Sequence, residues 1–478
     1  MVRPGWRALV TALGVTFTCP AATNPSVSNS QSFRNATGIM QTYSMSGPLE
    51  LTGPFFQPLG TNGRSCASCH RADQGWALSA EGVKARFQAT RGRDPIFRAS
   101  DGANCDSHKD VSTSDGRRSA FSLLINRGLI RVALPVADHA DFEVVQVENS
   151  YGCVDRKAVS VYRRPLPVTN LRFLSSVMWD GRGSSGLAGT VPIAAATNPD
   201  DLMTDLAQQA RDAGRVHEAS RPLTPHQVQS IVKFEISLAT AQAFDDKAGA
   251  LDAGGAKGGP ATLATWTIPA FFVGINDPRG GDPHAIKPED AVRLFDAWSD
   301  RPYGRVYSDV PAAIDSQSSR RASIARGQVL FNQKPFDIRG VVGLNDTLRL
   351  PSITGACGTC HNSPNAGNRS VEALMNTGTT DTEGPLDVSY LPTITLRNRH
   401  TDEVKMTTDP GLALITGHWN DIGKVKVPIL RGLAARPPYF HNGSAQSLGE
   451  VIDFYNKRFH AGISARERED LIAFLSSL

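Results

Sequence analysis

The clearest hydrophobic pattern in the chain begins at Thr224. Thr224 can cap a helix, Pro225 suits the first helical position, and Gln227 completes a capping box with Thr224. The side chains that then recur at helical spacing are Val228, Ile231, Val232, Glu235 and Leu238. This pattern predicts a helix that closes a first domain.

Three further segments repeat the helical pattern. Apolar residues recur after Ser323, and capping boxes at Ser447 with Glu450 and at Ser464 precede two amphipathic segments at the end of the chain. Residues 119–126 form a short apolar run that predicts a buried segment. With 43 glycines and 30 prolines among 478 residues, we expect helices joined by long irregular segments rather than a large continuous sheet.

The same reading divides the chain into five parts. We expect a signal peptide at 1–22, an irregular N-terminal arm at 23–60, a first domain at 61–246, a linker and irregular insertion at 247–320, and a second domain at 321–478. The start of the linker is rich in glycine and alanine, which is typical of a flexible linker or surface loop.

Charge and hydropathy exclude two classes of partner. The 50 basic and 46 acidic residues are too evenly balanced for a nucleic-acid-binding protein of this size, and the formal charge of +4 includes two arginines of the leader. No segment approaches the roughly 18 continuous apolar residues of a transmembrane helix. We therefore expect neither nucleic-acid binding nor a membrane span.

The first 22 residues resemble a secretory leader. Arg3 and Arg7 precede the apolar stretch 8–15, and small residues follow at Ala21 and Ala22. An ordinary N-terminal helix is the alternative. Large or rigid neighbours disfavour a lipid anchor at Cys19. We expect an exported, soluble, periplasmic protein.

Four of the seven cysteines form two Cys-x-x-Cys-His motifs. Two thiols three positions apart can reach the two vinyl groups of one porphyrin, and the adjacent imidazole can then ligate the iron. One such motif alone could be a zinc half-site or a redox dithiol, but two copies behind a leader favour covalent haem. We assign two c-type haems, with attachment and proximal ligation by Cys66, Cys69 and His70 and by Cys357, Cys360 and His361.

Outside the leader, two cysteines remain. In an oxidising compartment Cys105 and Cys153 are expected to form a disulfide, which would stabilise the fold by about 4 kcal/mol in the chain-entropy model. Two separate buried thiols are the alternative.

Three sequence blocks, in addition to the two haem motifs, resemble the bacterial dihaem cytochrome c peroxidase family. That family includes the methylamine-utilisation dihaem enzyme and, more distantly, haem-containing rubber oxygenases. The resemblance extends over most of residues 60–240 and 320–478. The blocks are Met178–Arg182, Lys426–Leu433, and Pro438–Ser444 running into Leu448–Tyr455.

The resemblance implies two all-α cytochrome c-like domains and a periplasmic oxidoreductase. Electrons from a small donor protein, such as a cytochrome c or a cupredoxin, would enter at the second haem, and hydrogen peroxide would be reduced at the first. Trp179 of the Trp-Asp-Gly-Arg block is the candidate inter-haem relay, with a core aromatic as the alternative.

Tyr455 stands where the peroxidases place a methionine as distal ligand of the second haem, and the methylamine-utilisation enzyme has tyrosine there. Leu448 and Val451 share its helical face, so Tyr455 is expected to point inward, as an iron ligand or as a core tyrosine. Met406 is another distal candidate. His441 is interpreted as part of the structural or haem-edge environment.

Two departures from the family affect the prediction. Residues 183–198 contain neither the glutamine nor the glutamate that supply acid-base chemistry in the peroxidases. The absence of these residues favours, as alternatives, a dihaem oxidase or oxygenase acting on a protein or organic substrate, or a non-catalytic electron-transfer cytochrome.

The second departure concerns calcium. Arg118 and Arg436–Pro438 align with the calcium-binding positions of the family. Because arginines disfavour a divalent cation, the sequence does not support calcium.

Overall fold

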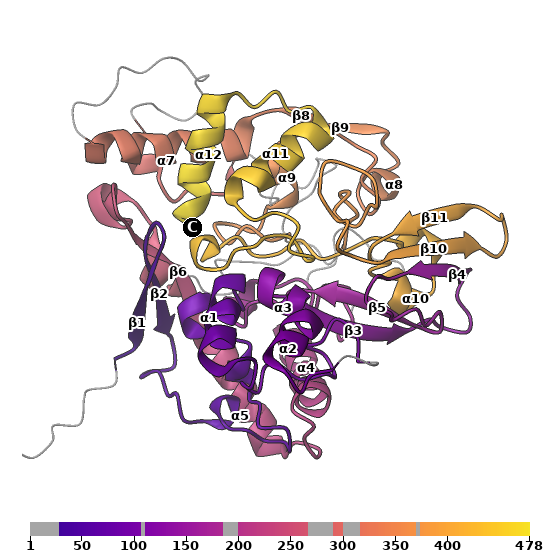
Figure 1. Cartoon of the computed structure of the whole chain (residues 1–478). Helices are drawn as coiled ribbons and strands as arrows, with labels where there is room; N and C mark the ends of the chain where they lie inside the picture. The colour runs from indigo at the N-terminus through magenta and orange to yellow at the C-terminus, as the bar shows by residue number, and fades with distance from the viewer. Residues whose placement is uncertain (1–27, 107–109, 185–198, 266–289, 300–315, 370–372) are drawn as a thin grey trace, which may run out of the picture.

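The protein has a mixed α/β architecture in the computed structural model (Figure 1). The structure describes residues 28–106, 110–184, 199–265, 290–299, 316–369 and 373–478. The predicted leader and Cys19 lie outside these residues, as does most of the loop after the Trp-Asp-Gly-Arg block. None of the described helices is long and apolar enough to cross a membrane.

The all-α prediction is wrong, because the described residues form four antiparallel sheets. Their strands are short, and several pair with strands that are distant in sequence, so the chain carries no long alternating pattern to reveal them. The strands are β1 (Ser30–Asn35), β2 (Gly38–Ser44), β3 (Ile130–Pro135), β4 (Phe142–Glu148), β5 (Ala158–Arg163), β6 (Leu238–Asp245), β7 (Gly249–Ala250), β8 (Phe336–Arg339), β9 (Ser352–Gly355), β10 (Thr393–Asn398) and β11 (Val404–Thr407).

The largest sheet has the strand order β1-β2-β6-β7. Its first two strands form a hairpin inside the segment expected to be an irregular arm, and β6 continues directly from the helix that begins at Pro225. Alternate residues of β2 are buried, which explains why this segment pairs as a strand. The arm is therefore fixed to the first half of the chain.

Helices supply most of the remaining regular structure. The capping boxes at Thr224 and Ser464 form as predicted, whereas Ser447 caps its helix and Glu450 instead accepts the backbone N–H of Gln446 at 2.8 Å. The α-helices are α1 (Ala80–Thr90), α2 (Ser114–Ala120), α3 (Ser122–Arg127), α4 (Pro199–His217), α5 (Pro225–Ser237), α6 (Gly259–Ala264), α7 (Ser316–Gln333), α8 (Asn345–Leu348), α9 (Cys357–Cys360), α10 (Ala413–Thr416), α11 (Leu448–Phe459) and α12 (Ala465–Ser476).

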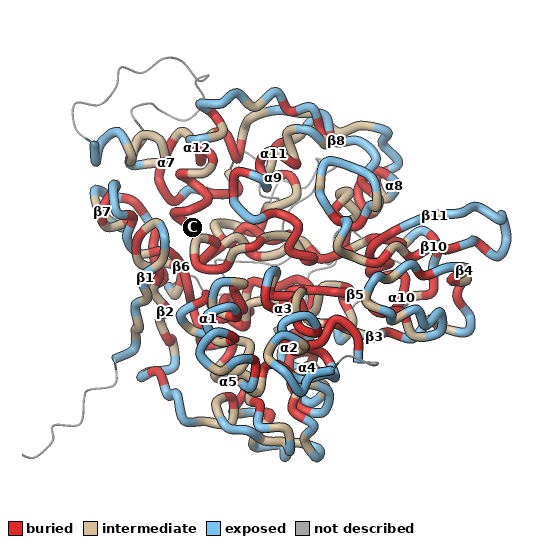
Figure 2. Tube along the Cα trace, viewed as in Figure 1, coloured by how far each residue is buried: buried red, intermediate tan, exposed pale blue. Residues whose placement is uncertain are grey.

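Each half of the chain has its own apolar core. Phe55, Trp76 and Ile231 belong to the core of the first half, and Phe331 and Phe474 to that of the second. Buried segments run through both halves of the chain (Figure 2). Helices α7 and α12 cross closely at Gly327, where a Cβ atom would lie 2.0 Å from the carbonyl oxygen of Asp470. Only glycine permits this approach.

The segment expected to be a flexible linker is packed instead. Residues 247–261 contain β7 and the start of α6, and Ala248 and Leu251 are fully buried in the second core. Small and apolar side chains make glycine-rich segments compatible with burial as well as with flexibility, so composition did not distinguish the two.

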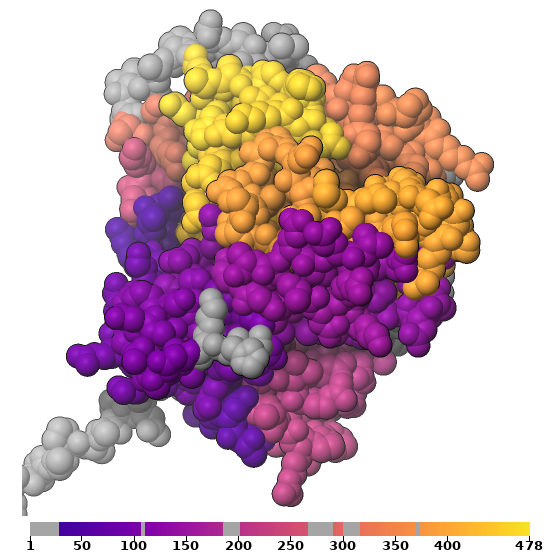
Figure 3. Space-filling view, turned by 45° about the vertical axis from the view of Figure 1, so that its right-hand side comes forward, coloured from indigo at the N-terminus to yellow at the C-terminus, as the bar shows by residue number. Residues whose placement is uncertain are grey.

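The two halves share one continuous interface (Figures 1 and 3). Strand β10 of the second half pairs with β4 of the first, and the carbonyl oxygen of Leu478 accepts the backbone N–H of Gln242 in β6 at 3.1 Å. Because these links join distant parts of the chain, the halves are held in one relative position.

Candidate haem sites

The first Cys-x-x-Cys-His motif forms a single tight turn, η2 (Cys66–Ser68). The backbone N–H groups of Cys69 and His70 both donate to the carbonyl oxygen of Cys66, at 3.2 and 3.0 Å. Both thiols and the imidazole line one cavity, which we call the first cavity.

The second motif repeats this arrangement in α9. The backbone N–H of His361 donates to the carbonyl oxygen of Cys357 at 3.0 Å. Cys357, Cys360 and His361 line a separate cavity, which we call the second cavity. The motifs therefore serve two sites, one in each half.

The imidazoles of His70 and His361 make the same type of hydrogen bond, from Nδ1 to a backbone carbonyl oxygen. Nδ1 of His70 lies 3.2 Å from the carbonyl oxygen of Trp76, and Nδ1 of His361 lies 2.5 Å from that of Gly367. Burial lowers the pKa of each imidazole to about 4, so both are neutral at physiological pH. Because a carbonyl oxygen can only accept, Nδ1 carries the proton and Nε2 keeps a lone pair that could bind a metal.

The cysteines of the two motifs do not converge on one metal site. Among the described residues, the single cluster of three or more metal-ligating side chains is Cys105, Asp106 and Cys153. Burial raises the pKa of all four motif thiols. The two motifs, each a possible zinc half-site, therefore do not combine into one zinc site among the described residues.

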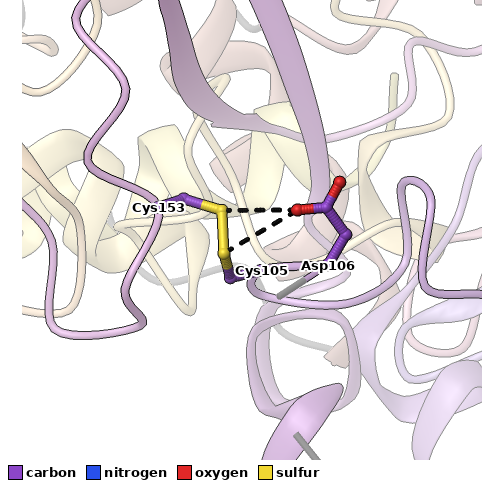
Figure 4. Close-up of side chains that lie close together, drawn as sticks. All are labelled: Cys105, Asp106 and Cys153. Atoms are coloured by element: carbon purple, nitrogen blue, oxygen red, sulfur yellow. Dashed lines mark hydrogen bonds between the residues drawn. A yellow bond between two sulfur atoms is a disulfide. The ribbon is translucent and has the colours of Figure 1, made fainter. Parts of the chain in front are cut away.

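Cys105 and Cys153 form the predicted disulfide. Figure 4 shows the carboxylate of Asp106 beside both sulfur atoms. Since both thiols are consumed in this bond, the cluster of Cys105, Asp106 and Cys153 is a covalent link between two loops of the first half.

Size and charge of both cavities fit a haem. They enclose about 1470 and 1520 Å³ of empty space, open solvent at their mouths included, and their walls are mostly apolar. Arg164 is buried beside both cavities and Arg436 beside the second, and in the part of the chain that the structure describes the Nε atom of each has no hydrogen-bond partner. Burial lowers the pKa of Arg164 to about 9 and that of Arg436 to about 10. Such uncompensated cations fit the two propionate groups of a haem.

Five residues line both cavities and form what we call the shared wall. They are Arg164, Pro165, Pro167, Trp179 and Lys426. The indole N–H of Trp179 donates to the carbonyl oxygen of Arg164 at 2.7 Å, and the carbonyl oxygen of Trp179 accepts the backbone N–H of Lys426 at 2.8 Å. The centre of its ring lies 6.0 Å from that of His441. Trp179 is thus held by backbone hydrogen bonds in the wall between the two cavities.

A buried ion network lies directly behind this tryptophan. Arg163 forms two hydrogen bonds with Asp409, at 2.7 and 2.8 Å, and a third with Asp180, the neighbour of Trp179. Burial alone would lower the pKa of Arg163, but Asp409 and Asp180 raise it above its usual value. The network joins β5, the Trp-Asp-Gly-Arg block and the second half of the chain.

The other residues that the sequence suggested as iron or calcium ligands lie in different parts of the structure. Tyr455 and His441 line the second cavity, and burial raises the pKa of the Tyr455 phenol. Met406 lies on β11 with 52% of its surface exposed and lines neither cavity, so the structure does not support it as a distal ligand. Arg118 lies on the surface of α2 over the ring of Phe87, whereas Arg436 is buried beside the second cavity.

Three carboxyl groups line the first cavity, those of Asp101, Glu218 and Glu235, and the sequence alone assigns a functional role to none of them. Glu218 and Glu235 are both 3% exposed. Burial raises the pKa of both, that of Glu235 to about 8. The available signal was the presence of a charged residue, Glu235, within the apolar face of α5.

Part of the chain is similar in sequence to known cytochrome-c peroxidases. The chain is 30% identical over 220 residues to cytochrome-c peroxidase IdrP1 of Pseudomonas sp. (strain SCT), which covers 42% of the chain and 50% of that protein. It is 32% identical over 232 residues to cytochrome-c peroxidase IdrP1 of Denitromonas iodatirespirans, covering 44% and 54%. Over less than half of its length the chain is therefore similar to cytochrome-c peroxidases.

The match to the cytochrome-c peroxidases confirms the resemblance inferred from the haem motifs and sequence blocks. The chain spans about half the length of these relatives. Their names imply a haem-containing oxidoreductase. No family model matches the chain. A solved MauG-like protein associated with microbial copper homeostasis covers 89% of the chain and is covered over 85% of its own length, at 14% identity and a TM-score of 0.36, too weak a likeness to support an argument.

Proposed function

We propose that the protein is a periplasmic dihaem c-type oxidoreductase of the cytochrome c peroxidase type. It reduces hydrogen peroxide in the first cavity with electrons that a small donor protein delivers to the second. The observation that carries this proposal is the shared wall, because Trp179 lines the cavities of both Cys-x-x-Cys-His motifs. The similarity to cytochrome-c peroxidases supports the same chemistry.

The motifs supply the anchoring groups. Cys66 and Cys69 would hold one haem by thioether bonds and Cys357 and Cys360 the other, with Nε2 of the two motif histidines towards the iron. A bound haem supplies one-electron redox chemistry and an iron position at which peroxide can bind. The buried basic side chains of the shared wall, Arg164 and Lys426, would compensate propionate charge. Burial lowers the pKa of Lys426 to about 7, and a propionate beside it would favour its charged form.

The chain also orients the electron path. Reduction of one hydrogen peroxide to two waters takes two electrons and two protons, so electrons must reach the first cavity from outside. Hydrogen bonds to Arg164 and Lys426 fix Trp179 between the cavities, and the Arg163 network fixes the adjacent Asp180. Trp179 is therefore the proposed inter-haem relay.

One experiment tests the proposal directly. The purified holoprotein is assayed for covalent haem, then for the spin state of each ferric haem, and finally for peroxide consumption with reduced cytochrome c as the donor. We expect two covalent haems per chain, of which one responds to peroxide, and oxidation of two donor molecules per peroxide. Two low-spin haems that do not respond to peroxide would contradict every catalytic proposal and favour an electron-transfer cytochrome.

One observation favours a second candidate. Tyr455 lies in the second cavity, and phenolate ligation stabilises oxidised iron. A second haem whose oxidised iron is stabilised in this way fits oxidation of a protein or organic substrate better than efficient removal of peroxide. In the same assay, rapid reaction with peroxide without oxidation of the donor would favour this candidate.

A further inference from the structure

Glu235 is a buried acid in the wall of the first cavity. It lies on α5 and is 3% exposed, and among the described residues its Oε2 atom has no hydrogen-bond partner. Burial disfavours the charged form and raises the pKa of this carboxyl to about 8. A buried carboxyl of this kind can gain or lose a proton near neutral pH.

The second cavity has leucine at the matching position. Helices α5 and α12 each begin with a capping box, at Thr224 and Ser464, and each lines its cavity through residues seven and eleven positions after the cap. In α5 these residues are Ile231 and Glu235, and in α12 they are Leu471 and Leu475. Packing around a haem therefore does not require an acid at this position, and the glutamate distinguishes the first site from the second.

Other acids and bases of this cavity have partners of their own. Glu218 accepts the backbone N–H of Leu59 at 3.2 Å, a hydrogen bond that does not depend on the Cys66 thiol. Asp101 binds Arg64 at 2.5 Å and Nδ1 of His217 at 2.7 Å.

Cations reach the cavity from three further segments of the chain. Arg163 and Arg182 both bind Asp180, and Lys426 donates to the carbonyl oxygen of Ser176 at 2.7 Å. Arg164 donates to the carbonyl oxygen of Leu78 at 2.5 Å. Among the described residues, no ion pair joins any of these groups to Glu235, so its proton is free to respond to charge within the cavity.

We propose that Glu235 holds the proton that balances a change of redox state in the first cavity. Its carboxyl takes up one proton from solvent when one electron arrives there from the donor, and returns it when that electron leaves. The side chain of His217, which is 33% exposed and lines the same cavity, provides contact with solvent. The proposal rests on the proposed function only in requiring a redox-active haem at the first motif.

The test is a potentiometric titration of both haems in the holoprotein between pH 5 and pH 10, followed by optical absorbance. We expect the reduction potential of the first haem to fall with rising pH, with a slope approaching about 59 mV per pH unit, the value for one proton per electron. In Glu235→Gln, which keeps size and hydrogen-bonding capacity, this slope should be strongly reduced. Glu235→Leu, which copies the second cavity, should give the same result.

Controls separate the proposal from its alternatives. Glu450→Gln, an exposed carboxyl on α11, should leave both slopes unchanged, and the second haem serves as an internal reference for propionate titration. An unchanged slope in Glu235→Gln, or a slope lost in Glu218→Gln but kept in Glu235→Gln, would overturn the proposal. Covalent haem content is measured in each sample, so a missing cofactor, which would contradict the proposed function, is distinguished from missing proton coupling.

Discussion

Trp179 donates its indole N–H to the carbonyl oxygen of Arg164 at 2.7 Å, and both residues line both cavities. The hydrogen bond fixes the ring in the wall that separates the two Cys-x-x-Cys-His motifs. A fixed position of the Trp179 ring matters because electron transfer depends on a short and constant separation between donor, relay and acceptor.

The first prediction concerns this relay. Trp179→Phe keeps an aromatic ring but removes the N–H and the larger π-system, so we expect electron transfer from the second haem to the first to slow by about tenfold or more, a barrier increase of roughly 1.4 kcal/mol. Stopped-flow absorbance after mixing the half-reduced protein with peroxide measures this rate. Trp419→Phe, a buried tryptophan that lines neither cavity, is the matched control and should leave the rate unchanged. Equal rates in both variants would exclude a relay role.

The second prediction tests Tyr455 as an iron ligand. Tyr455→Met should raise the reduction potential of the second haem and alter its ferric absorbance spectrum, because thioether ligation favours ferrous iron and phenolate ligation favours ferric iron. Tyr439→Phe is the control, since Tyr439 lines the same cavity and donates its hydroxyl to the carbonyl oxygen of Leu433 at 3.0 Å. A spectrum and potential that do not change in Tyr455→Met would show that Tyr455 only packs in the core.

The sequence predicted helices where local signals are strong. The capping boxes at Thr224 and Ser464 and the apolar run at 119–126 correspond to α5, α12 and a buried segment in the structure. Strands were missed because their partners are remote. Strand β10 pairs with β4 across more than half of the chain, and neither segment carries a hairpin signal between them.

The residues of the candidate site likewise divide into those that local sequence predicts and those that only the fold brings together. Local spacing was sufficient to group Cys66, Cys69 and His70 around one cavity. The position of Trp179 came from the family resemblance, since an isolated tryptophan is more often a core residue. The sequence near Arg182 does not point to Glu235, because the fold brings this carboxyl to the first cavity from a helix more than fifty residues later.

The third prediction concerns the disulfide. Replacing Cys105 and Cys153 by serine should lower the free energy of unfolding by about 4 kcal/mol in the chain-entropy model, because the bond joins residues 48 positions apart. Thermal unfolding followed by circular dichroism measures the loss. A reductant should destabilise the wild-type protein and leave the double variant unaffected. If the two proteins unfold at the same temperature without reductant, the bond does not stabilise the fold.

The fourth prediction is a pH dependence set by the pair Asp409 and Arg163. Burial raises the pKa of Asp409, but Arg163 outweighs burial and holds this pKa below its usual value. Since the carboxyl is more acidic in the folded than in the unfolded protein, its contribution to stability is complete above about pH 4 and is lost as pH falls through the folded pKa. The wild-type melting temperature should therefore fall on acidification below this pH.

Asp409→Asn isolates this contribution. At pH 7 this substitution should lower the free energy of unfolding by about 3–5 kcal/mol, because it leaves the buried guanidinium of Arg163 with Asp180 alone. It should also weaken the dependence of the melting temperature on acid pH. Asp453→Asn is the matched control, because Asp453 binds Arg468 at 2.7 Å in a pair whose side chains are 43% and 37% exposed. Such surface pairs contribute at most about 1 kcal/mol. Equal losses in the two variants would mean that solvent screens the Arg163 network, and that it does not fix the shared wall beside Trp179.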